Sequence, residues 1–427
     1  MADSGGGVVE QHALSATTLQ ALADGYGGAE AVAELWRGQE SRRLLLFKLA
    51  HDHLADTTDR RTALKAVFEA EDREPELVRA ILVDPMVALW AAGIVRRAPR
   101  ETVPLADIVR LNEIAVAAAM WAESDVETRG WSRNGWVSIP TIGRLPVSEQ
   151  SGPVRLVVTK GLLSVDGLDR DLDDPGWQHA RTVTVGDDTD VQLEDIDPCR
   201  DTFHIRAAER LSDSDFDVWR RALDAAWQIL TQYCPERVLE LSAGLHALVP
   251  FPEPENRTAH SATARDAIGV IGLDLPKDPA ELAVTLIHEF QHSKLSSVLD
   301  VLDLYRPSDR LFFAPWRTDA RPISGLLQGV YAFIAVADTW ARLSAVPERF
   351  PRAQREFAES RAQVSEALDT LAGSDLLTSA GERFLTGMRG AVNRLNSIQL
   401  PTVAEAAAER LLADRRAAWQ IANPAAS

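Results

Sequence analysis

The hydrophobic pattern of this 427-residue chain changes its period along the sequence, and this change constrains the fold more than any other feature. Between residues 12 and 125, apolar side chains recur at helical spacing opposite charged ones, as in "AVAELWRGQESRRLLLFKLAHDHL" and "PELVRAILVDPMVALWAAGIVRR". From residue 126 onwards, "RGWSRNGWVSIPTIGRLPVSE" and "GPVRLVVTKGLLSVDG" carry β-branched and aromatic residues between Gly, Pro and Asn. This composition predicts a small antiparallel sheet over 126–208. We therefore expect an α+β protein that is predominantly helical.

After residue 208 the helical period returns, and two short apolar runs interrupt it. "LSDSDFDVWRRALDAAWQILTQYCPE" is predicted to be a helix with Ser212 or Ser214 as its N-cap. "GLHALVPF" and "DAIGVIGLDLP" are predicted strands, and further helices are expected from Ile323 to residue 421. These changes suggest three regions: a helical region 1–125, a mixed β/α region 126–275, and a mainly helical region 276–427.

The composition narrows the function classes. A net charge of −18 argues against a general nucleic-acid-binding role, and the acidic "GDDTDVQLEDIDP" is expected to be a solvated loop or hairpin tip. Only Cys199 and Cys234 are present, which favours a reducing compartment. Residues 1–15 lack a signal-peptide pattern, and the most apolar run, 113–123, is too short to span a bilayer. We expect a cytoplasmic protein without membrane or nucleic-acid partners.

The stretch "LAVTLIHEFQHSKLSSVLDVLDLY" contains an H-E-x-x-H motif formed by His288, Glu289 and His292. A helix is expected because the preceding "DPAE" supplies Asp278 as N-cap, a proline at the first helical position, and Glu281 three residues after the cap. Side chains four residues apart share a helix face, so the two imidazoles are placed to hold one metal ion. In a zinc peptidase Glu289 would be the general base. The alternative is a helix whose histidines have only a structural role.

Two classes of zinc peptidase fit this chain poorly. The metzincin pattern requires glycine and histidine where the chain has Leu295 and Val298, and this excludes the class. The gluzincin pattern requires a glutamate on the following helix. The next glutamate is Glu348, which lies beyond that helix.

The following helix instead carries Gln328, Tyr331 and Asp338. Asp338 would complete a site of two histidines and one carboxylate, which is typical of non-haem iron oxygenases. Gln328 is a weaker, neutral candidate for the third ligand. Hydrogen bonding around the site, or a helix face turned to solvent, is the alternative role of each of these residues.

Two arginines precede this helix in "APWRTDARP", namely Arg317 and Arg321. Arginine binds carboxylates in bidentate fashion, and an oxygenase that uses 2-oxoglutarate needs a cation for the distal carboxylate. A zinc peptidase has no such requirement. The alternative is a structural ion pair, for instance with Asp319.

Several stretches together resemble the HExxH-containing peptide-modification proteins of bacterial ribosomal-peptide clusters, a family of 2-oxoglutarate-dependent, iron-using peptide β-hydroxylases. They are "TLIHEFQHSKL", "APWR" with the following "RP", "GLLQGVYAF" and "HSATARDAIGVIGL", and the resemblance is sharpest over 258–342. It implies that His288 and His292 hold Fe(II), and that Glu289 loses the role of base and instead orients a ligand or a bound water. It also implies that Arg317 binds 2-oxoglutarate. The third ligand is not placed by the resemblance. His260 is a further nearby nitrogen, and the alternative is that it is a loop histidine on the surface.

The expected function is oxidative tailoring by a non-haem dioxygenase, which hydroxylates a side-chain carbon of a ribosomally made precursor peptide. Fe(II) would be the metal and 2-oxoglutarate the cosubstrate. A zincin-like metal helix beside a small antiparallel sheet is the expected frame. Two alternatives stay open: a zinc peptidase that processes a peptide, and a non-catalytic peptide-binding partner. A homodimer is compatible with the sequence.

Overall fold

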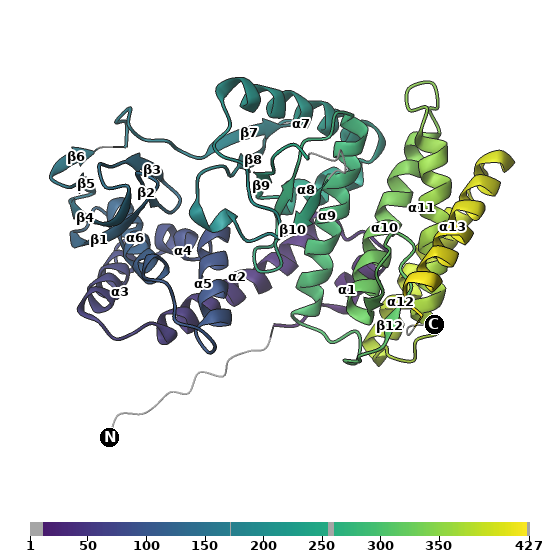
Figure 1. The fold of residues 1–427 in the computed structure, drawn as a ribbon, viewed down its shortest axis with the longest axis horizontal. Coiled ribbons are helices and arrows are strands. Elements are labelled where there is room, and N and C mark those ends of the chain that lie inside the picture. Colours follow the sequence, from purple (N-terminus) through teal and green to yellow (C-terminus); the bar gives the residue numbers. More distant parts are fainter. Residues whose placement is uncertain (1–11, 171, 255–259, 425–427) are drawn as a thin grey trace. The chain divides into compact units, whose positions relative to one another are not determined.

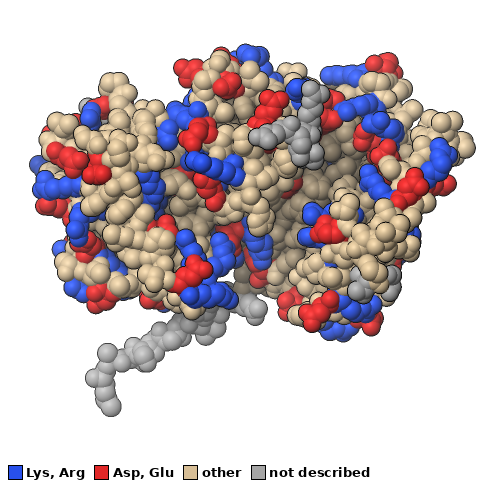
Figure 2. Space-filling model, viewed as in Figure 1, with Lys and Arg blue, Asp and Glu red and all other residues tan. Residues whose placement is uncertain are grey.

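The computed structural model describes residues 12–170, 172–254 and 260–424. Residues 1–11, which belong to the N-terminus without a signal-peptide pattern, lie outside this part. The protein is α+β as the sequence predicts, with more than half of its residues in helices and a curled antiparallel sheet (Figure 1). Figure 2 shows acidic and basic side chains interspersed over the visible face.

The chain divides into two compact units that each combine distant segments. Unit 1 comprises Met1–Gly38, Leu230–Gly244 and Phe290–Ser427, and unit 2 comprises Gln39–Ile229 and Leu245–Glu289. The expected boundaries at 125 and 275 follow the hydrophobic period, whereas these units follow packing. The dividing points therefore differ.

The predicted N-terminal helices are present and end where local chemistry requires. Their bounds are α1 (Ala16–Ala23), α2 (Gly28–His53), α3 (Thr58–Glu71), α4 (Pro75–Leu82), α5 (Pro85–Arg97) and α6 (Leu105–Trp121). The Asp84 carboxylate caps α5 by accepting from the backbone N–H groups of Met86 and Val87, and Pro85 takes the first helical position. The alanine-rich α6 is buried along most of its length. It packs against the first sheet of unit 2.

This first sheet has six antiparallel strands in the order β3-β2-β1-β4-β5-β6. Their bounds are β1 (Val126–Arg133), β2 (Trp136–Ile139), β3 (Gly143–Pro146), β4 (Ser151–Thr159), β5 (Leu162–Val165) and β6 (Leu168–Arg170). Along β1 and β4 buried and exposed residues alternate, as expected for a sheet with one face on a core and one in solvent.

The second sheet of unit 2 has five strands in the order β10-β11-β9-β8-β7. Their bounds are β7 (Arg181–Val185), β8 (Thr189–Leu193), β9 (Ala247–Pro250), β10 (Ser261–Thr263) and β11 (Val270–Leu273). The central strands are parallel, β8 with β9 and β9 with β11, and both edge strands are antiparallel to their neighbours. Both predicted apolar strands are present as β9 and β11, and every residue in them is buried. Such short apolar runs are typical of parallel strands covered on both faces.

The prediction of one small antiparallel sheet over 126–208 is wrong, because strands of two different sheets fall in this range. Strands β7 and β8 lie outside the antiparallel sheet: they pair with each other, and β8 also pairs with β9, which follows much later in the chain. The acidic stretch supplies the turn of the β7–β8 hairpin, as expected, but its middle part forms β8, in which Val191 and Leu193 are buried. A short 3-10 helix, η1 (Pro198–Arg200), follows, and then α7 (Asp213–Tyr233). Ser212 is the N-cap, since its hydroxyl accepts from the Asp215 backbone N–H.

Unit 2 encloses a cluster of buried acidic groups where β8 ends. Glu194 accepts hydrogen bonds from the backbone N–H groups of Ile196 and Asp197 and is 3% exposed. Burial, and then repulsion from Asp197, raise the pKa of Glu194 to about 7. Burial raises the pKa of Asp84 to about 6. The buried Arg110 contacts Asp197 and Glu113 and partly balances the cluster.

Replacing Glu194 with glutamine is expected to flatten the pH dependence of unfolding. Between the unfolded pKa near 4.5 and the folded pKa of about 7, the folded state binds more protons, so wild-type stability falls as pH rises. The glutamine variant lacks this fall and should be more stable than wild type at pH 8 by about 1–3 kcal/mol. Urea unfolding at pH 5 and pH 8 measures this, with the exposed Glu127→Gln as control. Parallel pH curves for the Glu194 variant and wild type would contradict it.

Unit 1 is mainly a helical assembly. Its helices, besides α1 and the first part of α2, are α8 (Pro235–Gly244), α9 (Pro279–Leu299), which continues from unit 2, α10 (Ile323–Ser344), α11 (Ala353–Ala372), α12 (Ser379–Asn396) and α13 (Thr402–Ala422). A two-stranded ribbon, β12 (Leu311–Phe312) with β13 (Arg321–Pro322), precedes α10. Helix α11 packs against α10 and α13 (Figure 1).

Helix α10 is the apolar centre of unit 1. Among the described residues it is the one single helix long and apolar enough to cross a membrane by length and composition, and 72% of its apolar window is buried in the protein. The core helix of a folded unit has the same composition. The run 113–123, the most apolar stretch by sequence, begins in α6 and ends two residues beyond it.

Candidate metal centre

Helix α9 carries the H-E-x-x-H motif and begins as the sequence predicts. The Asp278 carboxylate accepts from the Ala280 backbone N–H at 2.9 Å, and Pro279 is the first helical residue. From Ala280 to Val298 most side chains are buried. The part-exposed ones are Glu281, Thr285, His288 and His292. Their spacing places them on one stripe of the helix, so both imidazoles lie on its accessible face.

Glu289 lies beside this stripe but is buried, with 3% of its surface exposed. Its carboxylate accepts hydrogen bonds from the hydroxyls of Ser261 at 2.7 Å and Thr263 at 2.6 Å. Both hydroxyls come from β10, the antiparallel edge strand of the five-stranded sheet. The carboxylate therefore ties α9 to this strand. The nearest approach to the His288 ring, from Nε2 to Oε1, is 3.9 Å, too long for a hydrogen bond.

His292 is oriented by the next helix of unit 1. Its Nδ1 lies 3.0 Å from Oε1 of Gln328, and Nε2 of Gln328 donates to the Ser296 hydroxyl at 3.2 Å. An amide oxygen only accepts, so in this arrangement Nδ1 of His292 carries the proton. Nε2 then keeps its lone pair. Histidines that bind metals are commonly held in this way, with one nitrogen donating to a neighbour and the other free to ligate.

Asp338, the other candidate for the third ligand, is not brought to His292. It follows Gln328 by ten residues on α10, which is about 15 Å along a helix. Its carboxylate accepts from the Tyr26 hydroxyl and lies 3.7 Å from Arg237 and 3.5 Å from Arg342. This contact and burial raise the pKa of Tyr26 to about 12, with burial the larger cause. Asp338 thus belongs to an ion-pair cluster. Gln328, and not Asp338, is the neighbour of His292.

Tyr331, also considered for the site, belongs to the core of unit 1. It is fully buried, its hydroxyl donates to the Leu22 carbonyl at 2.9 Å, and its ring packs on Phe384. With its one polar group satisfied, it has a structural role here.

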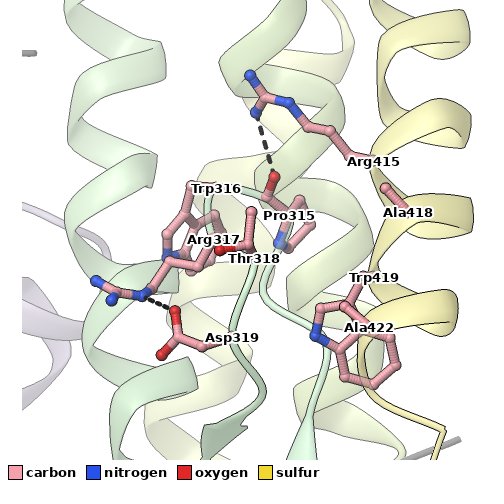
Figure 3. Close-up of a pocket in the computed structure, with 9 residues that line it drawn as sticks. All are labelled: Pro315, Trp316, Arg317, Thr318, Asp319, Arg415, Ala418, Trp419 and Ala422. Atoms are coloured by element: carbon pink, nitrogen blue, oxygen red, sulfur yellow. Dashed lines mark hydrogen bonds and ion pairs between the residues drawn. The ribbon is translucent and has the colours of Figure 1, made fainter.

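The two loop arginines adopt the ion pair that was the alternative to cosubstrate binding. Nε of Arg317 donates to Asp319 at 2.6 Å, and Arg321 donates to the other oxygen of Asp319 at 3.1 Å. The hydrogen bond from Arg317 is the main cause that lowers the pKa of Asp319. Their surroundings differ. The Arg321 guanidinium lies against Gly325, where a side-chain carbon would come within 2.9 Å of it, one turn before Gln328. Arg317 lines a pocket beside α13 (Figure 3).

His260 stands directly before β10 in unit 2. Its backbone N–H donates to the Asp274 carboxylate, and its imidazole Nδ1 lies 3.8 Å from the same carboxylate. The side chain is 37% exposed. His260 thus neighbours Ser261 in sequence, but no contact places it on Glu289.

Several residues at this centre escape prediction from the sequence. Ser261 and Thr263 alternate along an edge strand, so both hydroxyls point to one face, and this spacing was the available signal. Ser296 follows His292 by one turn. The buried Lys294, on the opposite side of α9, donates to Glu240 at 3.0 Å, and no local pattern indicates that pair.

No protein-family model and no curated protein matches this chain. Among the described residues, His, Cys, Asp and Glu side chains do not form a ready cluster of three for a metal ion. The centre therefore consists of a histidine pair on one helix, with Gln328 beside His292.

Proposed function

We propose that the chain is a non-haem Fe(II)/2-oxoglutarate-dependent hydroxylase that modifies a side-chain carbon of a ribosomally made precursor peptide. The observation that carries the proposal is that the Glu289 carboxylate is buried and hydrogen-bonded. A general base must reach the water that it activates. Here the carboxylate is buried and held by the hydroxyls of Ser261 and Thr263. An H-E-x-x-H helix whose glutamate is used in this way suits non-hydrolytic metal chemistry better than peptidase chemistry.

The residues present fit a metal ion in two respects. His288 and His292 lie one turn apart on the accessible stripe of α9. Nδ1 of His292 donates to Gln328, the kind of contact that orients histidine ligands of metals. We propose these two imidazoles as ligands and Gln328 as the residue that orients His292. Iron bound with 2-oxoglutarate and O₂ would supply the oxidising power, as cofactors generally carry the hard chemistry.

We also propose that the strands of unit 2 and the motif helix form a zincin-like arrangement. Strand β9 is followed by the antiparallel edge strand β10, then by β11 and the motif helix. An exposed edge strand can bind an extended peptide through main-chain hydrogen bonds. In the proposed enzyme, β10 would hold the peptide while Glu289 fixes β10 to α9. The same arrangement is the observation that favours the second candidate, a zinc peptidase.

The charge requirement of 2-oxoglutarate supports the oxygenase over the peptidase. Of the two loop arginines, Arg321 lies on Gly325, one turn from the Gln328 that contacts His292. We propose that Arg321 binds the distal carboxylate, with Asp319 as its partner in the free protein. The resemblance favours Arg317 for this role, and the two assignments are separable.

Arg321→Gln is expected to raise the apparent KM for 2-oxoglutarate ten- to hundredfold while the KM for peptide changes little. The reason is the loss of a charge-assisted contact, which is worth about 1.5–3 kcal/mol. Arg317→Gln is the matched variant, because it shares the Asp319 partner. Steady-state kinetics with each substrate varied in turn give the answer. A larger cosubstrate effect in Arg317→Gln would return the role to Arg317.

The proposed function is tested by Glu289→Gln with a product assay. The glutamine keeps an oxygen that accepts from one hydroxyl, and its amide N–H₂ can donate to the other, so the tie to β10 survives. The variant should retain iron and at least a tenth of the wild-type 2-oxoglutarate turnover. The wild-type product, analysed by mass spectrometry, should be an intact peptide heavier by about 16 Da, one oxygen atom.

A zinc peptidase gives the opposite result. Loss of its general base lowers the rate by roughly 10²–10⁴-fold. Cleaved fragments that form with zinc, need no 2-oxoglutarate and disappear in Glu289→Gln would replace the oxygenase by the peptidase. A peptide that binds but is neither oxidised nor cleaved with either metal would indicate a non-catalytic binding partner.

A further inference from the structure

A pocket of about 500 Å³ lies in unit 1 between the loop before β13 and helix α13 (Figure 3). The loop contributes the stretch from Pro315 to Asp319, and α13 contributes Arg415, Ala418, Trp419 and Ala422. Both walls are anchored. Arg415 donates to the Pro315 carbonyl at 3.2 Å, and the Asn423 side-chain amide donates to the Thr318 carbonyl at 3.1 Å. The pocket is thus formed by elements that hold each other in place.

The indole of Trp419 is the most informative group in the wall. The residue is 6% exposed and packs against Phe313 with 5.3 Å between ring centroids. Its Nε1–H has no hydrogen-bond partner among the described residues. Buried tryptophans usually satisfy this donor. Figure 3 shows the indole nitrogen on the side of the ring that faces the loop. The nitrogen itself is buried, so the acceptor of a ligand reaches it only when the ring moves within the wall.

The charges around the pocket favour an anionic acceptor. Arg317 and Arg415 both line it, and Asp319, the one acidic residue among the described residues of the wall, is shared between Arg317 and Arg321. The local balance is positive in a chain whose net charge is −18. Arginine N–H groups match the planar carboxylate. The remaining wall, with Pro315, Trp316 and Ala418, is apolar and suits the hydrocarbon part of a ligand.

We infer that this pocket binds a carboxylate carried by an extended peptide, namely an acidic side chain flanked by apolar residues. The carboxylate accepts from the arginines of the wall and, once the indole ring has moved, from Trp419 Nε1–H, and the apolar neighbours lie on Pro315, Trp316 and Ala418. The inference rests on the proposed function only in naming a peptide as the partner. It gives the peptide a second point of attachment, separate from the histidine pair on α9.

The test uses two blocked peptides, Ac-Ala-Leu-Glu-Leu-Ala-NH₂ and its Gln counterpart, and free glutarate. The full chain, labelled with ¹⁵N at its indole groups, is titrated without iron or 2-oxoglutarate. The Trp419 indole resonance, identified by its absence in Trp419→Phe, should shift in a saturable way with the Glu peptide. The Gln peptide should bind at least about tenfold more weakly, because it loses the charge-assisted contacts. Glutarate should also bind more weakly, because it lacks the apolar flanks.

Arg415→Gln should weaken the Glu peptide by about tenfold. Arg389→Gln, which removes an arginine from an exposed ion pair with Asp369 outside the pocket, should not change its affinity. Equal affinity for the Glu and Gln peptides, or no shift of the Trp419 resonance, overturns the inference. Glutarate binding as tightly as the Glu peptide assigns the pocket to free dicarboxylates and also overturns it. Because neither metal nor turnover is involved, failure of the hydroxylase proposal leaves this result unaffected.

Discussion

His292→Ala is expected to abolish stoichiometric iron binding and to lower peptide hydroxylation by more than about 10³-fold, while the chain stays folded. A site with two protein imidazoles loses its metal when one is removed, because affinity comes from the combined ligands. The helix itself does not need the imidazole. It is capped by Asp278, and alanine is a better helix former than histidine. His288→Ala should behave in the same way.

The measurement is elemental analysis of protein purified without oxygen and loaded with Fe(II), together with circular dichroism. Thr285→Ala, on the same stripe of α9, is the matched control and should keep its iron. Gln328→Leu should give an intermediate result, with metal affinity reduced about 10–100-fold, because it removes the acceptor that orients His292. Full iron content and activity in either histidine variant would show that the metal site lies elsewhere.

The local parts of this fold were predictable because their determinants are close in sequence. Proline and aspartate at the start of α9, Ser212 before α7, and the alternation along the antiparallel strands each act within a few residues. Strand pairing is different. The sequence of β8 predicts only a loop or hairpin tip. Its place in a mixed sheet depends on pairing with β9, which follows much later in the chain. Nothing within β8 indicates that partner.

The candidate site shows the same division between local and distant determinants. The spacing of His288 and His292 is local, and it placed both on one stripe of a helix as expected. The choice between Gln328 and Asp338 depends on helix phase and on what packs against α10. Ten residues advance a helix by nearly three turns, so the two side chains meet different neighbours: Ser296 and His292 for one, Tyr26 and Arg237 for the other. Ligand chemistry alone favours the Asp338 carboxylate over the neutral Gln328 amide as a third metal ligand.

The second large effect is expected from Glu240→Ala, which should reduce the free energy of unfolding by about 3–5 kcal/mol. Glu240 on α8 accepts from Lys294 at 3.0 Å and from Arg237 at 3.2 Å, and all three side chains are at most 2% exposed. Burial opposes ionisation of Glu240, yet the two cations keep its pKa below the usual value. Without the carboxylate, two buried cations lose their main counter-charge. Burial already lowers the pKa of Lys294 to about 8.

Glu240→Ala should also affect the proposed metal site, because Lys294, which donates to Glu240, is two residues from His292 on α9. Iron affinity of Glu240→Ala is therefore expected to fall together with stability, whereas Glu240→Leu combined with Lys294→Met should recover part of both, since it removes one charge of each sign. Asp369→Ala, from an exposed ion pair with Arg389, is the control and should cost less than about 1 kcal/mol. Urea unfolding and iron titration of the four proteins decide the matter. If Glu240→Ala is as stable as the control, the buried pair does not hold α9 in place.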